Sequence, residues 1–289
     1  MEFLSLTSLE ETLEKLESFG ADAAMVAGGT AIRYQLVSGQ IKANTVLHIE
    51  RLGKAQGISC NGVTRLGALT NLRDIAENGK ILKHFPSVAQ AAGKCGGWQT
   101  QSVATVGGNV CGAAPNADLV PPLLVQDAEV ELTSRARGSH SLALGDFLLD
   151  AYKTALAPDE MATAFLLPAP PARSADIYVK IQRRSAMERP IIGVALRLTL
   201  DESLKQVQEV RIAVSGANAV PFRAIAAETL LAGQTPGKDA LRATADAILK
   251  RCIFRTDARA SASYRAAVLP RAFAYAVSKC ATAITNNDS

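Results

Sequence analysis

Apolar residues near the start of the chain follow two spacings, which predict one helix and two strands. Between Leu9 and Phe19 they recur every three or four positions, as in an amphipathic helix, and Ser8 with Glu11 forms a capping box in front of it. Short apolar runs at 23–27 and 45–49 are typical of strands, with room for a short helix between them. The beginning of the chain therefore predicts a small βαβ-like unit.

The next part of the chain mixes signals for strands and helices. Asn61-Gly62 lies between "GISC" and "VTRLGA" and is the strongest short signal for a hairpin. Beyond it, helical and strand-like stretches follow one another without an internal repeat. We expect helices over 71–81 and 86–93, and strands over 128–134, 140–144 and 161–168.

A proline-bearing connector at 169–174 precedes a last third with a different pattern. Three stretches alternate like an antiparallel meander (177–184, 191–200 and 207–217), and alanine-rich helical stretches start near Phe222, Lys238 and Ala260. The predicted fold class is α+β. It has a two-part first domain, the small βαβ-like unit over 1–55 and a mixed α/β unit over 56–170, followed by an antiparallel-sheet-plus-helices carboxy-terminal domain over 175–285.

Composition limits the classes of function. The 289 residues are 48% apolar and 20% charged, with a net charge of +4 and 5% aromatic residues, so nucleic-acid binding is not favoured. The sequence starts without the features of a signal peptide, and no stretch reaches about 18 apolar residues, so we expect a cytoplasmic protein without a membrane span. Five cysteines without CxxC spacing and three scattered histidines argue against a disulfide framework, an iron–sulfur cluster or a zinc ribbon in this chain.

Two glycine-rich stretches are the candidate chemistry, "VAGGTAI" at 26–32 and "TVGGNVCGAAPNAD" at 105–118. Glycines permit positive φ and let backbone N–H groups approach a ligand closely, which suits phosphate oxygens. Each such bond to a charged oxygen contributes about 1.5–3 kcal/mol, so a few of them hold a pyrophosphate without lysine or arginine. The alternative is that each pair only serves a tight turn. Neither stretch matches the dinucleotide-binding or P-loop fingerprint.

Longer segments in a fixed order carry a resemblance to a known family. They are "VAGGTAIRYQLVSG", "ATVGGNVCGAAPNADLVPPLLVQDAEVEL", "PDEMATAFLLP", "YVKIQRRSAMERPIIGVAL" and "TDARASASYR". In this order they resemble the FAD-binding subunit of the xanthine dehydrogenase and carbon monoxide dehydrogenase family of molybdenum hydroxylases. The resemblance covers nearly the whole chain, and it implies that the first two parts of the chain form an FAD-binding domain.

The resemblance also implies cofactor-binding residues in two loops and at three separate positions. The loops resemble the two halves of a clamp on the FAD pyrophosphate and ribityl chain. The first consists of Val26, Ala27, Gly28, Gly29, Thr30, Ala31 and Ile32, and the second provides Ala104, Thr105, Gly107, Gly108, Asn109 and Cys111. The separate positions are Asp118, Met161 and Lys180, where the family has a cofactor-contacting aspartate, an apolar residue against the flavin and a lysine that reaches it. No catalytic residue or metal ligand is expected.

Two of the separate positions have alternative roles. A lysine at position 180 near the flavin favours reduced, anionic flavin by Coulomb attraction; otherwise Lys180 is an exposed lysine of a strand. Asp118 binds a ribose or ribityl hydroxyl, or it caps a helix that begins near Leu119. The sequence departs from the family pattern at Ala31, at Asn116 and at Glu188 with Pro190. These departures leave individual contacts open, but they do not affect the expectation of FAD as the cofactor.

The function that the resemblance implies is electron transfer. Electrons pass from a molybdopterin-binding large subunit to the 2Fe-2S clusters of an iron–sulfur small subunit and then to FAD in this chain. FAD passes them to an external acceptor such as NAD, a quinone or oxygen. The expected assembly is a dimer of heterotrimers. Two alternatives stay open, a non-redox nucleotide- or sugar-phosphate-binding protein and a self-contained flavin oxidase, although no histidine or tyrosine base is evident for the latter. The organic substrate of the complex is not indicated.

Overall fold

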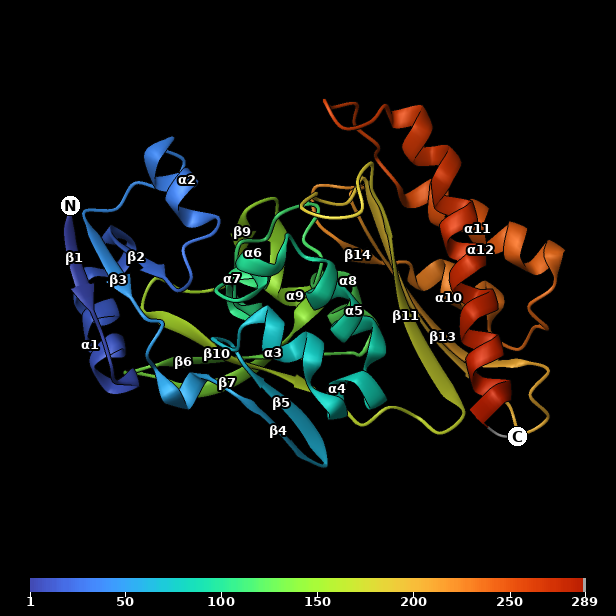
Figure 1. Cartoon of the computed structure of the whole chain (residues 1–289), viewed down its shortest axis with the longest axis horizontal. Helices are drawn as coiled ribbons and strands as arrows, with labels where there is room; N and C mark the ends of the chain where they lie inside the picture. The colour runs from blue at the N-terminus through green and yellow to red at the C-terminus, as the bar shows by residue number, and fades with distance from the viewer. Residues whose placement is uncertain (288–289) are drawn as a thin grey trace.

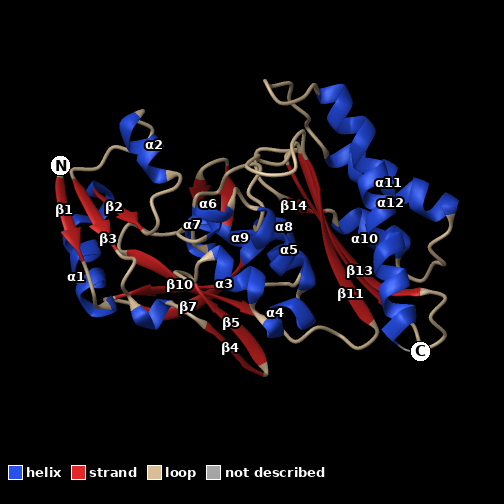
Figure 2. Ribbon diagram, in the orientation of Figure 1, coloured by secondary structure: helices blue, strands red, loops and turns tan. Residues whose placement is uncertain are grey.

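The chain folds into an elongated molecule in which three parts follow one another from the amino to the carboxy end (Figure 1). The computed structural model describes residues 1–287. The parts are built on sheets of three, five and four strands, and helices pack around each sheet (Figure 2). None of the helices over residues 1–287 combines the length and the apolar character that a membrane span requires.

The first part is a parallel sheet with the strand order β1-β3-β2. The expected helix and both strands are confirmed, and the Ser8 side chain accepts a hydrogen bond from the Glu11 N–H at 3.1 Å. Strand β1 was not expected, because its residues are mostly exposed and carry no apolar alternation. The elements are β1 (Glu2–Ser5), α1 (Leu9–Phe19), η1 (Gly20–Asp22), β2 (Ala23–Val26), α2 (Ile32–Val37), β3 (Thr45–His48) and η2 (Gly53–Ala55).

The middle part is an antiparallel sheet with the order β4-β5-β10-β6-β7. The hairpin at Asn61-Gly62 is confirmed, with Gly62 at a φ of 81°. Its elements are β4 (Ile58–Asn61), β5 (Val63–Gly67), α3 (Leu72–Glu77), α4 (Gly79–His84), α5 (Pro86–Lys94), α6 (Trp98–Gln101), α7 (Val106–Cys111), α8 (Val120–Val125), β6 (Glu129–Ser134), β7 (Gly138–Ala143), α9 (Leu144–Phe147), β8 (Leu148–Asp150), β9 (Lys153–Thr154) and β10 (Glu160–Leu167).

The prediction of one helix over 71–81 was wrong, because Asn78 divides it into α3 and α4. Asn78 has an extended backbone, with φ −69° and ψ 120°, and its Oδ1 accepts the N–H groups of Lys80 at 3.0 Å and Ile81 at 3.2 Å. Asparagine is a favoured helix N-cap because its side chain replaces the missing backbone acceptor. The apolar spacing continues across the break, so periodicity alone hides it.

The last part is an antiparallel sheet of order β11-β12-β13-β14 with three helices, as expected. The central strand β12 is buried along its whole length. Its Val194 and Leu196 face a core shared with α12, whereas Ala195 faces the core of the middle part. The sheet therefore joins the two parts. Its elements are β11 (Ser174–Ile181), β12 (Ile192–Leu200), β13 (Val207–Ser215), β14 (Phe222–Arg223), α10 (Ile225–Leu231), α11 (Lys238–Arg251) and α12 (Ala262–Asn287).

A buried carboxyl group lies at the contact between the middle part and the last sheet. Asp176 of β11 is 7% exposed and accepts a hydrogen bond from the backbone N–H of Ser87, at the start of α5. Burial raises the pKa of Asp176 to about 6, although the bond from Ser87 opposes the rise. The folded protein therefore binds this proton more tightly than the unfolded chain does.

Replacing Asp176 with asparagine should remove one component of the pH dependence of stability. Because the folded pKa of about 6 lies above the ordinary value of 3.8, the stabilising contribution is complete below pH 4 and is lost as the pH rises through 6. The free energy of unfolding of the wild type should lose about 3 kcal/mol over this range relative to Asp176→Asn. Urea unfolding of both proteins from pH 4 to pH 7 measures the difference, and parallel curves would contradict the prediction.

Candidate functional site

The first glycine loop leads from the end of β2 to α2 and presents a run of unpaired backbone donors. The N–H groups from Gly28 to Arg33 make no hydrogen bond within residues 1–287. Gly29 has a φ of 68°, which a residue with a side chain rarely adopts. A Cβ on Gly28 would lie 1.8 Å from the carbonyl oxygen of Val103, so this glycine is required for a backbone contact. The loop has the donors that an anionic oxygen needs.

The contact between Gly28 and Val103 brings the two glycine-rich stretches together, because Val103 lies two positions before the second one. The second stretch is not a bare loop, however, since Thr105 caps α7 and both glycines lie in that helix. The N–H of Gly107 donates to the carbonyl of Ala68 at 2.7 Å, and the N–H of Gly108 donates to Thr105 Oγ1 at 3.0 Å. Both N–H groups therefore have acceptors within the chain, and their contact with a pyrophosphate stays a prediction.

Close packing explains the need for a glycine at position 107. A Cβ there would lie 2.6 Å from the carbonyl oxygen of Ala68, at the end of β5. The neighbouring Asn109 also has a structural role, since its Oδ1 accepts the N–H of Leu119 at 3.2 Å and its Nδ2 lies 3.5 Å from Cys95 Sγ. The second stretch thus fixes the backbone against which the first loop rests.

Asp118 and Lys180 form a buried ion pair between the middle part and β11. The Lys180 Nζ lies 3.1 Å from Asp118 Oδ1, and it also donates to the carbonyl of Lys94 at 2.7 Å. The Lys180 side chain is only 1% exposed, so the alternative of an exposed strand lysine is wrong. Asp118 does not cap α8, whose first turn has no side-chain cap. Instead it accepts the hydroxyl of Tyr178 at 2.9 Å.

The electrostatics of this cluster follow from its burial. Burial raises the pKa of Asp118, whereas the Lys180 ammonium and the Tyr178 hydroxyl oppose the rise by stabilising the carboxylate. Burial and the nearby Asp118 raise the pKa of the Cys95 thiol to about 12, so this thiol stays neutral at physiological pH. Tyr178 was not among the site residues predicted from the sequence. Its position two residues before Lys180 on one strand, and hence on the same face, was the available signal.

Two further residues of the predicted site, Met161 and Cys111, pack into hydrophobic cores. Met161 of β10 is 2% exposed and packs with Leu13, Leu16 and Leu47 of the first part. Cys111 packs against the core of the middle part, and burial raises its pKa to about 12. Their contact with a cofactor stays a prediction.

An apolar groove lies beside the first loop, between α2 and the sheet of the first part. It has a volume of about 390 Å³, and its lining includes Phe3, Val26, Ile32 and Val46. The unpaired N–H groups from Gly28 onward and this apolar surface therefore lie next to each other.

The matches to known protein families identify the class of protein, a flavoprotein. Residues 1–170 match the family described as the FAD binding domain in molybdopterin dehydrogenase, and residues 177–280 match the CO dehydrogenase flavoprotein C-terminal domain. The chain belongs to this family and is an FAD-binding subunit of the molybdenum hydroxylase type. The predicted family, fold class and cofactor are thereby confirmed.

Relatives of known name agree with this assignment. The xanthine dehydrogenase FAD-binding subunit of Escherichia coli O157:H7 is 30% identical over 246 residues, which are 84% of this chain and 83% of that protein. The carbon monoxide dehydrogenase medium chain of Hydrogenophaga pseudoflava is 25% identical over 285 residues, 97% of this chain and 98% of the other. A solved structure of carbon monoxide dehydrogenase from that organism superimposes with a TM-score of 0.92 over 98% of both chains, at 25% identity.

Proposed function

We propose that this chain carries electrons between an iron–sulfur subunit and an external acceptor, within a complex whose molybdopterin subunit oxidises the organic substrate. Bound FAD supplies the redox chemistry, because it exchanges both single electrons and pairs of electrons. The observation that carries the proposal is the run of unpaired N–H groups from Gly28 to Arg33. It occurs in a chain that matches flavoprotein families over residues 1–170 and 177–280.

The residues present fit the cofactor. The first loop would hold the pyrophosphate through its backbone N–H groups, and helix α7 would hold the backbone behind it in place. Asp118 would accept a ribose or ribityl hydroxyl with the lone pairs that Tyr178 and Lys180 leave free. Met161 and the remaining residues of the two loops, which the family resemblance predicted to bind the cofactor, are kept as part of this proposed site.

The partners follow from the same proposal. The chain would work with a molybdopterin-binding large subunit and an iron–sulfur small subunit, in a cytoplasmic dimer of heterotrimers. The names of two relatives, the FAD-binding subunit of a xanthine dehydrogenase and the medium chain of a carbon monoxide dehydrogenase, support a role as one subunit of a larger enzyme. The division of the chain into 1–55, 56–170 and 175–285 is likewise kept as a proposal. The non-redox alternative has no support from the comparisons.

Titration of the purified apoprotein tests the cofactor. We expect one FAD per chain, with much weaker binding of FMN, because FMN lacks the pyrophosphate that the first loop would hold. Binding of a nucleotide or sugar phosphate in preference to FAD would favour the non-redox alternative instead.

Isolation of the tagged chain from its own cells tests the partners. The expected result is co-purification of two further subunits with molybdenum and iron in fixed ratio to the flavin. A flavin-containing chain that purifies alone and oxidises an organic substrate at full rate would contradict the proposed assembly.

A further inference from the structure

Helix α8 is fixed at both ends by side chains of the last sheet. Asp118 lies two residues before α8, and Asp127 lies two residues after it. Asp118 binds Tyr178 and Lys180 of β11, whereas Asp127 binds arginines of β12, β13 and β14. These ion pairs and the bond to Tyr178 all cross from the middle part of the chain to the last part, whereas Cys95 is a partner of Asp118 within the middle part.

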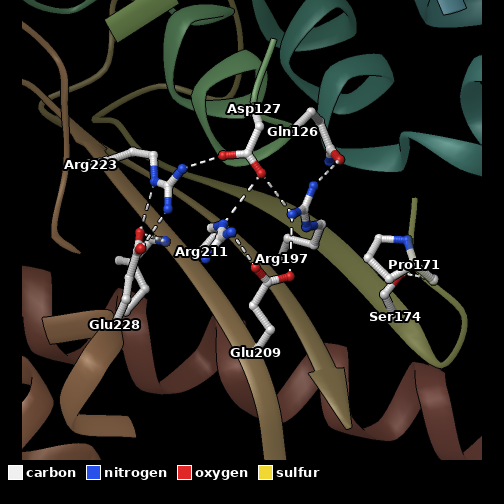
Figure 3. A network of polar contacts seen from close by, with 10 residues as sticks. Gln126, Asp127, Pro171, Ser174, Arg197, Glu209, Arg211, Arg223 and Glu228 are labelled. Carbon is white, nitrogen blue, oxygen red and sulfur yellow. Dashed lines mark hydrogen bonds and ion pairs between the residues drawn. The ribbon is translucent and has the colours of Figure 1, made fainter. Parts of the chain in front are cut away.

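Three arginines converge on Asp127 (Figure 3). Its Oδ2 lies 3.0 Å from Arg197 Nη2 and 3.3 Å from Arg211 Nε, and its Oδ1 pairs with Arg223. Asp127 has a φ of 53°, a conformation that aspartate tolerates better than most residues. This backbone conformation directs the chain from α8 into β6.

Acidic residues of the last part hold the same arginines in place. Glu209 lies 3.5 Å from Arg197, and Glu228 accepts from Arg223 Nε at 3.0 Å. The Arg197 side chain is 6% exposed, and its Nη1 also lies 3.4 Å from Gln126 Oε1. The arginines are therefore oriented by residues of β13 and α10, and Asp127 meets a preformed group of donors.

The helix between the two carboxylates is short and fully buried. All six of its residues are buried, and Pro121 and Pro122 fix its first turn. It spans only about 9 Å, and it packs against β12 and β13. A displacement at Asp127 is therefore transmitted to Asp118 and is not absorbed by a flexible segment.

We propose that Asp127 is a positioning residue for the flavin site and acts through Asp118. By binding the three arginines, it sets the position of α8 against the last sheet, and thereby the position of the Asp118 carboxylate relative to Tyr178 and Lys180. The inference rests on the proposed function, in which Asp118 contacts FAD. It assigns control of flavin affinity to a residue at the opposite end of α8 from the cofactor contact.

The test is a double-mutant cycle on the FAD dissociation constant of the full chain. Asp127→Asn keeps the shape and the backbone preference of the residue but removes its charge, and it should weaken FAD binding on the order of tenfold. In a protein that already carries Asp118→Asn, the same change should have almost no further effect. Asp201→Asn is the matched control, because the bonds of Asp201 stay within the last part, and it should leave the affinity unchanged.

Two results would overturn the inference. One is unchanged FAD affinity in Asp127→Asn, and the other is an equal loss of affinity with and without Asp118, which would indicate a general loss of structure. If Asp127→Asn does not fold, Arg211→Gln removes one of the three arginines, and the same cycle is read with a smaller expected change. Failure of the wild-type chain itself to bind FAD would count against the proposed function, not against this inference.

Discussion

Gly28→Ala should raise the FAD dissociation constant about a hundredfold or more. The added methyl group would lie 1.8 Å from the carbonyl oxygen and 2.4 Å from the carbonyl carbon of Val103, so the first loop must move away from the second stretch. Loss of two N–H bonds to a charged phosphate oxygen removes about 3 kcal/mol or more, which corresponds to this factor. Titration of the apoprotein with FAD, followed by flavin fluorescence, measures the change.

Gly79→Ala is the control for this substitution. Gly79 has no positive φ, and a Cβ at this position meets no atom within 4 Å. This variant should bind FAD as the wild type does. Gly28→Ala should also unfold at lower temperature in the apo state, since forced overpacking costs about 1–3 kcal/mol. Normal FAD affinity in a Gly28→Ala protein of lowered stability would mean that the loop serves the fold and not the cofactor.

Lys180→Met should lower the free energy of unfolding by about 3–5 kcal/mol, because it leaves the Asp118 carboxylate buried without its ammonium partner. The two side chains are 1% and 5% exposed, so solvent screens the pair little. Urea unfolding of the apoprotein at pH 7.5 measures the loss.

The double variant Asp118→Asn and Lys180→Met separates the charge from the packing. Asparagine is neutral and can still accept the Tyr178 hydroxyl, so the double variant should recover more than half of the stability that Lys180→Met loses. A double variant as unstable as the single one would show that packing of the lysine stem, and not the ion pair, accounts for the effect.

Much of the fold could be predicted where local chemistry and tertiary packing agree. The Asn61-Gly62 hairpin, the capped helix after Ser8 and the alternating strands of the last third are confirmed. Strand β1 could not be found, because it is held by pairing with β3 and not by an apolar pattern. The break at Asn78 was missed because the apolar repeat continues across it. An asparagine within such a repeat can lie inside a helix or cap a new one, and the pattern does not distinguish the two.

The sequence indicates the glycines of the proposed site but not the separate role of each one. Which N–H groups are free depends on distant carbonyls, such as that of Ala68 bonded to Gly107, and no local pattern encodes this. The same holds for Lys180, whose partner Asp118 lies 62 positions earlier in the chain. A single strand lysine is usually exposed, and only the fold shows that this one is paired and buried.

The packing of Met161 determines when the first part of the chain can complete its fold during synthesis. The core of the first part includes Leu69 and Met161 beside its own leucines, so the first 55 residues do not contain their complete core. Chains are synthesised from the amino end at about 5–20 residues per second. The core of the amino-terminal sheet thus stays incomplete for several seconds, until strand β10 has been synthesised. During that interval its apolar face is exposed and can associate with other nascent chains.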